Sequence, residues 1–191
     1  MAVDTNSINH KKTYAVLIGC SEYNYGLNAI LPVKGNLEDM RSLLMDKSYI
    51  GLPPENVFTS FNETSDSIKD LLFTTSRHEM DTLIIYYAGH GLRTGAKELC
   101  LAAINSKKLS DTEWLGIVEY GFIKRTILEQ CNARQKILLI DACQSGLAVQ
   151  SADDDIFKAG GAYVLASSQA GDESYFNPLE RNTCFTGTIL D

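Results

Sequence analysis

Two residues of the sequence offer the chemistry of nucleophilic catalysis, and each stands shortly after a run of apolar residues. Cys143 lies in the segment Asp141-Ala142-Cys143-Gln144-Ser145-Gly146, and His90 lies in Gly89-His90-Gly91. A thiol becomes a strong nucleophile when a neighbouring base takes its proton, and the protonated base can return that proton to a leaving amine. The pair therefore predicts acyl-transfer chemistry if the fold brings the two side chains together.

The same two segments also supply hydrogen-bond donors for a negative charge that develops on a carbonyl oxygen. We identify the backbone N–H groups of Gly91 and Cys143 as the candidate oxyanion hole. A single histidine or cysteine in a globular domain usually packs in the core or lies on the surface. The prediction therefore depends on the pair and not on either residue alone.

The remaining histidines and cysteines are weaker candidates for catalysis. His10 lies in a polar tail, and His78 lies near the predicted end of a helix. Cys20, Cys100 and Cys131 lie at or within apolar runs, where a free cysteine usually serves as a small core residue. The five cysteines are odd in number and form no C-x-x-C pair, so the sequence predicts neither a disulfide framework nor a zinc cluster.

The elements that position the pair can be read from the apolar pattern. Apolar runs predict buried strands at Tyr14–Gly19, Val57–Phe61, Thr82–Tyr87, Lys136–Ile140 and Ala162–Ala166. Helical spacing between them predicts helices around Leu37–Leu44, Ile68–Leu72 and Phe122–Leu128, the second behind the capping candidates Asn62 and Thr64. This alternation predicts an α/β fold with a mostly parallel sheet covered on both faces. Active sites of such sheets lie at the carboxyl ends of the strands, which is where His90 and Cys143 stand.

The size and composition limit the class of protein. The 191 residues, 45% of them hydrophobic and 21% charged, are typical of one globular domain, which we expect to span residues 13–191 after a polar tail at 1–12. A net charge of −7 argues against a nucleic-acid partner. No segment has the apolar core of a signal peptide or of a membrane span, so we expect a cytoplasmic protein with no membrane partner.

Taken together, the two motifs resemble those of the caspase-like cysteine peptidases, which include caspases, metacaspases and many bacterial relatives. The caspase nucleophile signature is Q-A-C-[RQG]-G with a histidine about 50 residues upstream. Here His90 precedes Cys143 by 53 residues (143 − 90). The Asp-x-Cys form followed by Ser-Gly is more similar to the metacaspase and bacterial branch, as are Tyr14–Cys20, Gly51–Pro54 and Ala162–Gln169.

This resemblance implies a three-layer αβα sandwich of the caspase type. It also implies a cysteine endopeptidase that acts on a protein or peptide substrate through a thioacyl-enzyme, without a cofactor, in a regulated system such as defence or cell-death signalling. The alternative is a catalytically silent caspase-like scaffold or signalling interaction module. The presence of both His90 and Cys143 favours the enzyme, because a scaffold has no chemical need of them.

Asp141 is the candidate substrate-binding residue, again because of the resemblance. Metacaspases carry an aspartate at this position and prefer Arg or Lys before the scissile bond, and a carboxylate at the base of the pocket pairs with such side chains. The resemblance therefore implies cleavage after Arg or Lys. One departure is Ala88, since some metacaspases have a serine two residues before the histidine. The alternative role for Asp141 is to hold a loop by accepting backbone N–H bonds.

Two further features leave alternatives open. Asp153-Asp154-Asp155 could bind calcium, as some metacaspases depend on that ion, but an acidic solvated loop explains the run as well. Trp114 stands in a polar stretch and is either a residue of a substrate loop or a hydrophobic anchor.

The end of the chain predicts a short helix. Asn182 or Thr183 could cap it, and Phe185, Ile189 and Leu190 would share one face. In caspase-like relatives the matching segment opens a longer helix followed by another strand. We therefore expect a domain truncated at its C-terminal end, completed by a downstream domain or second subunit. The alternative is a naturally short domain with a frayed terminus.

Overall fold

The computed structural model describes residues 9–143, 145, 161–167, 177 and 179–191 of the chain. Its elements are η1 (His10–Lys12), β1 (Thr13–Gly19), α1 (Pro32–Met45), η2 (Pro54–Asn56), β2 (Val57–Phe61), α2 (Ser65–Thr75), β3 (Thr82–Ala88), β4 (Gly91–Arg93), β5 (Leu99–Lys108), β6 (Trp114–Glu119), α3 (Tyr120–Ile123), the π-helix η3 (Lys124–Glu129), β7 (Gln135–Asp141), β8 (Ala162–Ala166) and α6 (Cys184–Leu190).

Five parallel strands form the central sheet, in the order β2-β1-β3-β7-β8. They are the five strands expected from the apolar runs, with ends that differ by one residue or not at all. The predicted mostly parallel sheet is therefore confirmed. The two strands that precede the candidate catalytic residues, β3 and β7, are direct neighbours in it.

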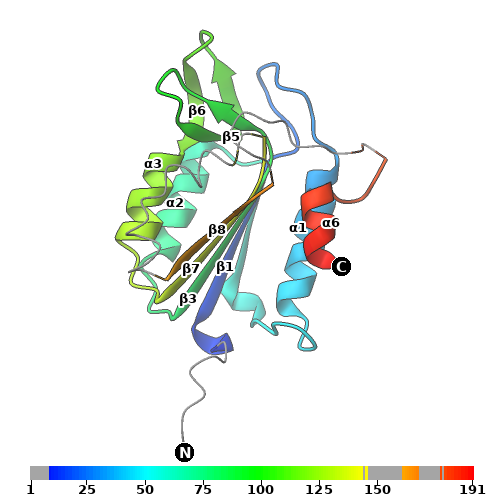
Figure 1. Cartoon of the computed structure of the whole chain (residues 1–191), viewed down its shortest axis with the longest axis vertical. Helices are drawn as coiled ribbons and strands as arrows, with labels where there is room; N and C mark the ends of the chain where they lie inside the picture. The colour runs from blue at the N-terminus through cyan, green and yellow to red at the C-terminus, as the bar shows by residue number, and fades with distance from the viewer. Residues whose placement is uncertain (1–8, 144, 146–160, 168–176, 178) are drawn as a thin grey trace, which may run out of the picture.

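Helices cover both faces of this sheet, which confirms the predicted three-layer αβα arrangement (Figure 1). The helices α2 and α3 lie on one face, and α1 and α6 lie side by side on the other (Figure 1). Strand β3 is buried along its whole length, as its unbroken apolar run requires. Its side chains alternate between the two cores, with Leu83, Ile85 and Tyr87 on the α2 face and Ile84, Tyr86 and Ala88 on the α1 face.

Of the two predicted capping residues of α2, only Thr64 caps the helix. The hydroxyl of Thr64 accepts a hydrogen bond from the N–H of Ser67 at 3.3 Å, so Thr64 is the N-cap. Asn62 has a left-handed backbone with φ of 53°, and its side-chain oxygen accepts from the N–H of Ser21 at 2.8 Å. Asn62 therefore does not cap α2, and that prediction is wrong. It fixes the chain where it leaves β1.

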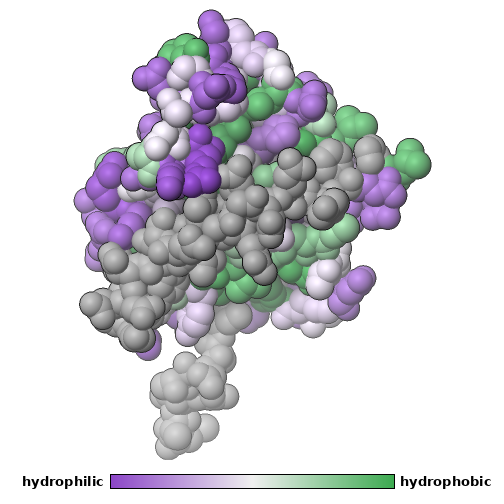
Figure 2. Space-filling model, turned by 45° about the horizontal axis from the view of Figure 1, so that its top comes forward, coloured by the Kyte–Doolittle hydropathy of each residue, from purple (hydrophilic) through white to green (hydrophobic). Residues whose placement is uncertain are grey.

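An antiparallel three-stranded sheet, in the order β4-β5-β6, lies beyond the carboxyl ends of the central strands. Trp114 begins β6 and packs, partly buried, against a small cluster that includes Leu92 and Cys100, which favours the role of a hydrophobic anchor. The described surface around this sheet is mostly hydrophilic (Figure 2, top). Within the described residues, no helix combines the length and apolar character needed to cross a membrane.

The helix α6 at the end of the chain differs from the prediction in its buried face. Thr183 is the N-cap, as one of the two predicted candidates. Ile189 and Leu190 pack against the core on the α1 face, but Phe185 does not join that cluster. The fully buried residue is instead Thr186, because positions 186, 189 and 190 share the inward face at helical spacing.

Candidate active site

The register of β3 and β7 brings the two predicted catalytic residues to one edge of the sheet. Ala88 pairs with Asp141, and His90 and Cys143 each stand two residues farther along. The pairing continues past the strands, because the N–H of Gly89 donates to the carbonyl oxygen of Asp141 at 3.2 Å. Both segments therefore leave the sheet side by side.

Gly91 lies directly against the backbone of the nucleophile segment. A Cβ atom on Gly91 would overlap the carbonyl oxygen of Cys143 and would lie 3.3 Å from the Cβ of Ala142. Only glycine allows the two segments to approach so closely. This contact explains the glycine after the histidine and places the two candidate oxyanion donors in adjacent segments.

Two tyrosines hold the backbone on either side of the imidazole. The N–H of His90 donates to the hydroxyl of Tyr23 at 3.0 Å, and that hydroxyl donates to the carbonyl of Cys20 at 2.7 Å. The hydroxyl of Tyr87 lies 2.9 Å from the carbonyl oxygens of both His90 and Ala102. These roles have no signal in the sequence, because packing alone explains an aromatic residue in a strand or loop.

The orientation of the imidazole is set by a backbone carbonyl. The Nε2 atom of His90 lies 2.9 Å from the carbonyl oxygen of Asn28, and the Tyr23 and His90 ring centroids are 5.0 Å apart. A carbonyl can only accept, so Nε2 carries the proton and Nδ1 is left with a lone pair. Burial lowers the pKa of His90 below its ordinary value, while the bond to Asn28 partly opposes that shift. The neutral imidazole is therefore favoured, as a base requires.

The loop that carries Asn28 is tied to the sheet at its base. Asn62 accepts hydrogen bonds from the N–H groups of Ser21 and Glu22 at 2.8 Å and 3.3 Å, and the N–H of Ile30 donates to the carbonyl of Ser21 at 2.9 Å. The loop is thus closed on itself, and the Asn28 carbonyl is held beside the imidazole. A backbone contact of this kind has no signature in side-chain types, so sequence analysis could not find it.

Asp141 lies beneath the nucleophile segment and is only 4% exposed. Its Oδ2 atom accepts hydrogen bonds from the hydroxyl of Thr183, from the hydroxyl of Thr186 at 2.7 Å and from the amide of Asn36 at 3.3 Å. Burial raises the pKa of Asp141, and the hydroxyl donors oppose that shift. These donors, and Ser167 after β8, are side chains, whereas the alternative role predicted for Asp141 uses backbone N–H groups.

The cysteines divide into buried and accessible ones. Cys20, Cys100 and Cys131 are buried, as predicted for core residues. Burial raises the pKa of Cys20 to about 11 and that of Cys100 to about 12, which keeps both thiols unreactive. Cys143 is partly exposed and Cys184 is exposed.

Some predicted features lie outside the described residues. These are the aspartates 153–155 with their possible calcium site, and Gln144 and Gly146 of the nucleophile motif. Among the residues that the structure describes, no group of three or more His, Cys, Asp or Glu side chains could hold a metal ion.

Comparison with known proteins points to one family. The family model described as the caspase domain matches residues 12–191. A crystal structure of caspase-1 from Spodoptera frugiperda matches with a TM-score of 0.70, at 17% sequence identity, over 100% of this chain and 73% of that chain. At this level of identity the structural match concerns the fold. A search of curated proteins finds no match.

Proposed function

The chain belongs to the caspase domain family, whose model matches residues 12–191, and we propose that it is an endopeptidase with Cys143 as nucleophile and His90 as general base and acid. The observation that carries this proposal is the β3–β7 register, which sets both residues two positions beyond the Ala88–Asp141 pair. The close contact of Gly91 with the Cys143 backbone supports it.

The proposed reaction follows from the hydrogen bonds around the imidazole. With Nε2 bound to the Asn28 carbonyl, Nδ1 of His90 takes the thiol proton as the sulfur of Cys143 attacks the peptide carbonyl. The N–H groups of Gly91 and Cys143 stabilise the oxyanion. The intermediate collapses to a thioester, and the imidazolium gives its proton to the leaving amine. Water then hydrolyses the thioester with His90 again acting as base.

Asp141 is the proposed determinant of specificity, with a preference for Arg or Lys before the scissile bond. Its buried carboxylate lies two residues from Cys143, so a substrate cation near it would gain a charge-assisted hydrogen bond. The competing role of Asp141 is structural, as the acceptor of hydrogen bonds from Thr183 and Thr186. Fluorogenic peptides ending in Arg, Lys, Asp and Leu separate the two, since a preference for Asp would rule out the carboxylate pocket.

A second polypeptide segment is the proposed partner in completing the sheet. Among the described residues β8 pairs only with β7, and its side chains Tyr163 and Leu165 are 58% and 51% exposed. A downstream domain or second subunit that covers this edge would remove an exposed template for association. We further propose a regulated role in cytoplasmic defence or cell-death signalling. The five cysteines of the sequence are odd in number and form no C-x-x-C pair, which is consistent with a reducing compartment.

Covalent capture tests the enzyme proposal against the alternative of a silent scaffold. A peptide acyloxymethylketone should label Cys143 ahead of the other four thiols, and His90→Ala should slow that labelling. The exposed Cys184 is the internal control for simple accessibility. Equal labelling of Cys143 and Cys184, with no effect of His90→Ala, would leave the scaffold as the better explanation.

A further inference from the structure

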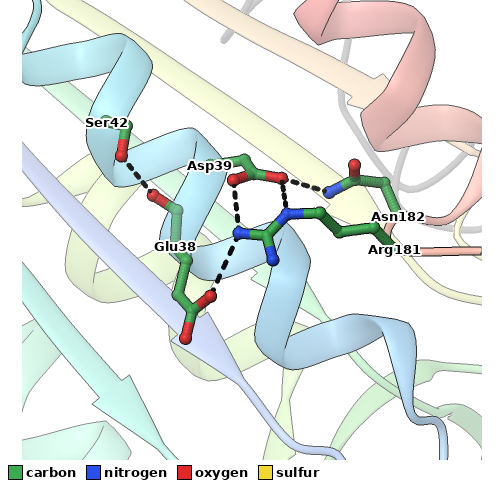
Figure 3. Close-up of polar contacts among 5 residues, drawn as sticks. All are labelled: Glu38, Asp39, Ser42, Arg181 and Asn182. Carbon is green, nitrogen blue, oxygen red and sulfur yellow. Dashed lines mark hydrogen bonds and ion pairs between the residues drawn. The ribbon is translucent and has the colours of Figure 1, made fainter.

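Two residues that precede α6 are held by carboxylates of α1. The guanidinium of Arg181 donates from Nε and Nη2 to the two carboxylate oxygens of Asp39, at 2.8 Å and 2.7 Å (Figure 3). Nη2 also donates to Glu38 at 3.1 Å, and Asn182 donates to Asp39 at 3.0 Å (Figure 3). A two-point contact between Arg and a carboxylate fixes direction as well as distance.

The same face of α1 also fits the backbone of this segment. A Cβ atom on Gly35 would overlap the carbonyl oxygen of Arg181. Asn36 is fully buried, and its side chain accepts from the N–H of Thr183 at 3.0 Å and donates to the Thr183 hydroxyl at 3.0 Å. Glycine and asparagine are both poor residues for a helix interior. Their presence here is explained by the segment 181–183, and we call this set of contacts the α1 latch.

A chain of hydrogen bonds connects the α1 latch at the surface to the nucleophile segment. Thr183, held by Asn36, donates its hydroxyl to Asp141. Thr186 in the first turn of α6 donates to the same carboxylate oxygen at 2.7 Å. Asp141 is the last residue of β7 and stands two positions before Cys143. The position of Arg181 therefore affects the position of the strand end that precedes Cys143.

We propose that Arg181 and Asp39 are positioning residues for Cys143, acting through Thr183 and Asp141. This inference rests on the proposed function of Cys143 as a nucleophile. The ion pair itself adds little to overall stability, because the Arg181 side chain is 60% exposed and an open hollow of about 490 Å³ adjoins it. Its effect is local, because it holds the hydroxyls of Thr183 and Thr186 in hydrogen-bonding position against the buried carboxylate of Asp141.

The experiment compares Arg181→Ala with a charge-swapped variant, Arg181→Asp with Asp39→Arg. Lys108→Met is the matched control, because it breaks another exposed ion pair, Lys108 with Asp111 at 2.8 Å, in the distant β5–β6 connection. Three quantities are measured on each protein: kcat and KM for peptide cleavage, the melting temperature, and the rate at which iodoacetamide alkylates Cys143, followed by peptide mass spectrometry.

We expect Arg181→Ala to lower kcat and the alkylation rate of Cys143 by about tenfold, since small displacements of reacting groups have effects of this size. KM should change by less than about twofold. The melting temperature should shift no more than in Lys108→Met, whose kcat stays at the wild-type value. The swapped pair should recover much of the loss, because it restores an ion pair across the same two positions.

The outcomes separate this inference from the proposed function. If wild-type protein cleaves no peptide but Arg181→Ala still slows alkylation of Cys143, the peptidase proposal fails and the latch stands. If both rates in Arg181→Ala equal those of the wild type, the latch is refuted. It is also refuted if the loss comes with a large fall in melting temperature and the swapped pair restores neither rate, because the role would then be structural.

Discussion

The two faces of the central sheet support the His90 and Cys143 segments in different ways, and consecutive tyrosines of β3 illustrate the contrast. Tyr87 packs on the α2 face, and its hydroxyl lies 2.9 Å from the carbonyl oxygen of His90. Tyr86 packs on the α1 face, and its hydroxyl lies 2.6 Å from that of Thr186, which donates to Asp141. One tyrosine contacts its segment directly, whereas the other acts through two more side chains.

We call the support of the His90 segment fixed and the support of the Cys143 segment adjustable. The support of His90 consists of tyrosine hydroxyls and a backbone carbonyl that meet its own main chain and ring. The support of Cys143 is a buried polar cluster that includes residues far apart in the sequence, Asn36 and Thr183 among them. Such a cluster can be loosened from the surface, whereas the Tyr87 contact cannot be altered without disturbing the core. The predictions that follow test this contrast.

The largest effect is expected from the two proposed catalytic residues themselves. Cys143→Ala and His90→Ala should each lower kcat by on the order of 10⁴-fold or more, and the double variant should be no slower than the worse single one, because the pair acts as a unit. Both side chains lie at strand ends and not in the core, so thermal unfolding should change little. Full activity in Cys143→Ala would contradict the peptidase proposal.

A substitution between the two segments should have the next largest effect. In Gly91→Ala the new methyl group would overlap the carbonyl oxygen of Cys143, so one segment must move. We expect kcat/KM to fall about 100-fold, which is the scale of a displacement near 1 Å. Gly187→Ala in α6 is the matched control, since a Cβ there meets nothing within 4 Å. That variant should be active and more stable by about 0.5–1 kcal/mol in chemical denaturation.

The two tyrosines allow a direct test of the contrast between the faces. Tyr87→Phe removes the hydroxyl next to two carbonyls, of His90 and Ala102, and should cost about 1–3 kcal/mol of unfolding free energy. It should also lower kcat/KM by about tenfold. Tyr86→Phe removes a hydroxyl whose neighbours, Thr186 and Asn36, are side chains with further hydrogen bonds to Asp141, so its effect on both quantities should be smaller. A larger effect of Tyr86→Phe would reverse the assignment of fixed and adjustable supports.

The strands, and the position of His90 and Cys143 at one edge of the sheet, could be predicted because both depend on local patterns. An almost unbroken apolar run such as Thr82–Tyr87 favours a buried strand, and the carboxyl ends of parallel strands meet at one edge. The missed features depend on contacts across the fold. The contact between the Asn28 carbonyl and His90 joins residues 62 positions apart. The hydrogen bond between Asn36 and Thr183 joins residues 147 positions apart. The one signal of the Asn36–Thr183 contact in the sequence is the pair Gly35 and Asn36 inside a predicted helix. Both residues weaken a helix, so their presence there indicates a contact with another part of the fold.

The smallest expected effect concerns the pH at which activity appears. The proposed mechanism needs neutral His90, and burial lowers the pKa of that group. The lower limb of the kcat/KM profile should therefore have its midpoint below the ordinary histidine value of about 6.5, because protonation is resisted until the pH falls further. Tyr23→Ala removes the ring that lies 5.0 Å from the imidazole and should move the midpoint up toward the ordinary value.

Two controls connect this measurement to the contrast between the faces. Tyr25→Ala, in the same loop but 52% exposed, should leave the midpoint in place. Asp141→Asn should also leave it in place, because burial and the Asn28 bond account for the His90 shift without a contribution from that carboxylate. A midpoint above the ordinary value in the wild type would mean that the imidazolium is the favoured form. Movement of the midpoint in Asp141→Asn would mean that the two segments share one electrostatic environment and are not separately supported.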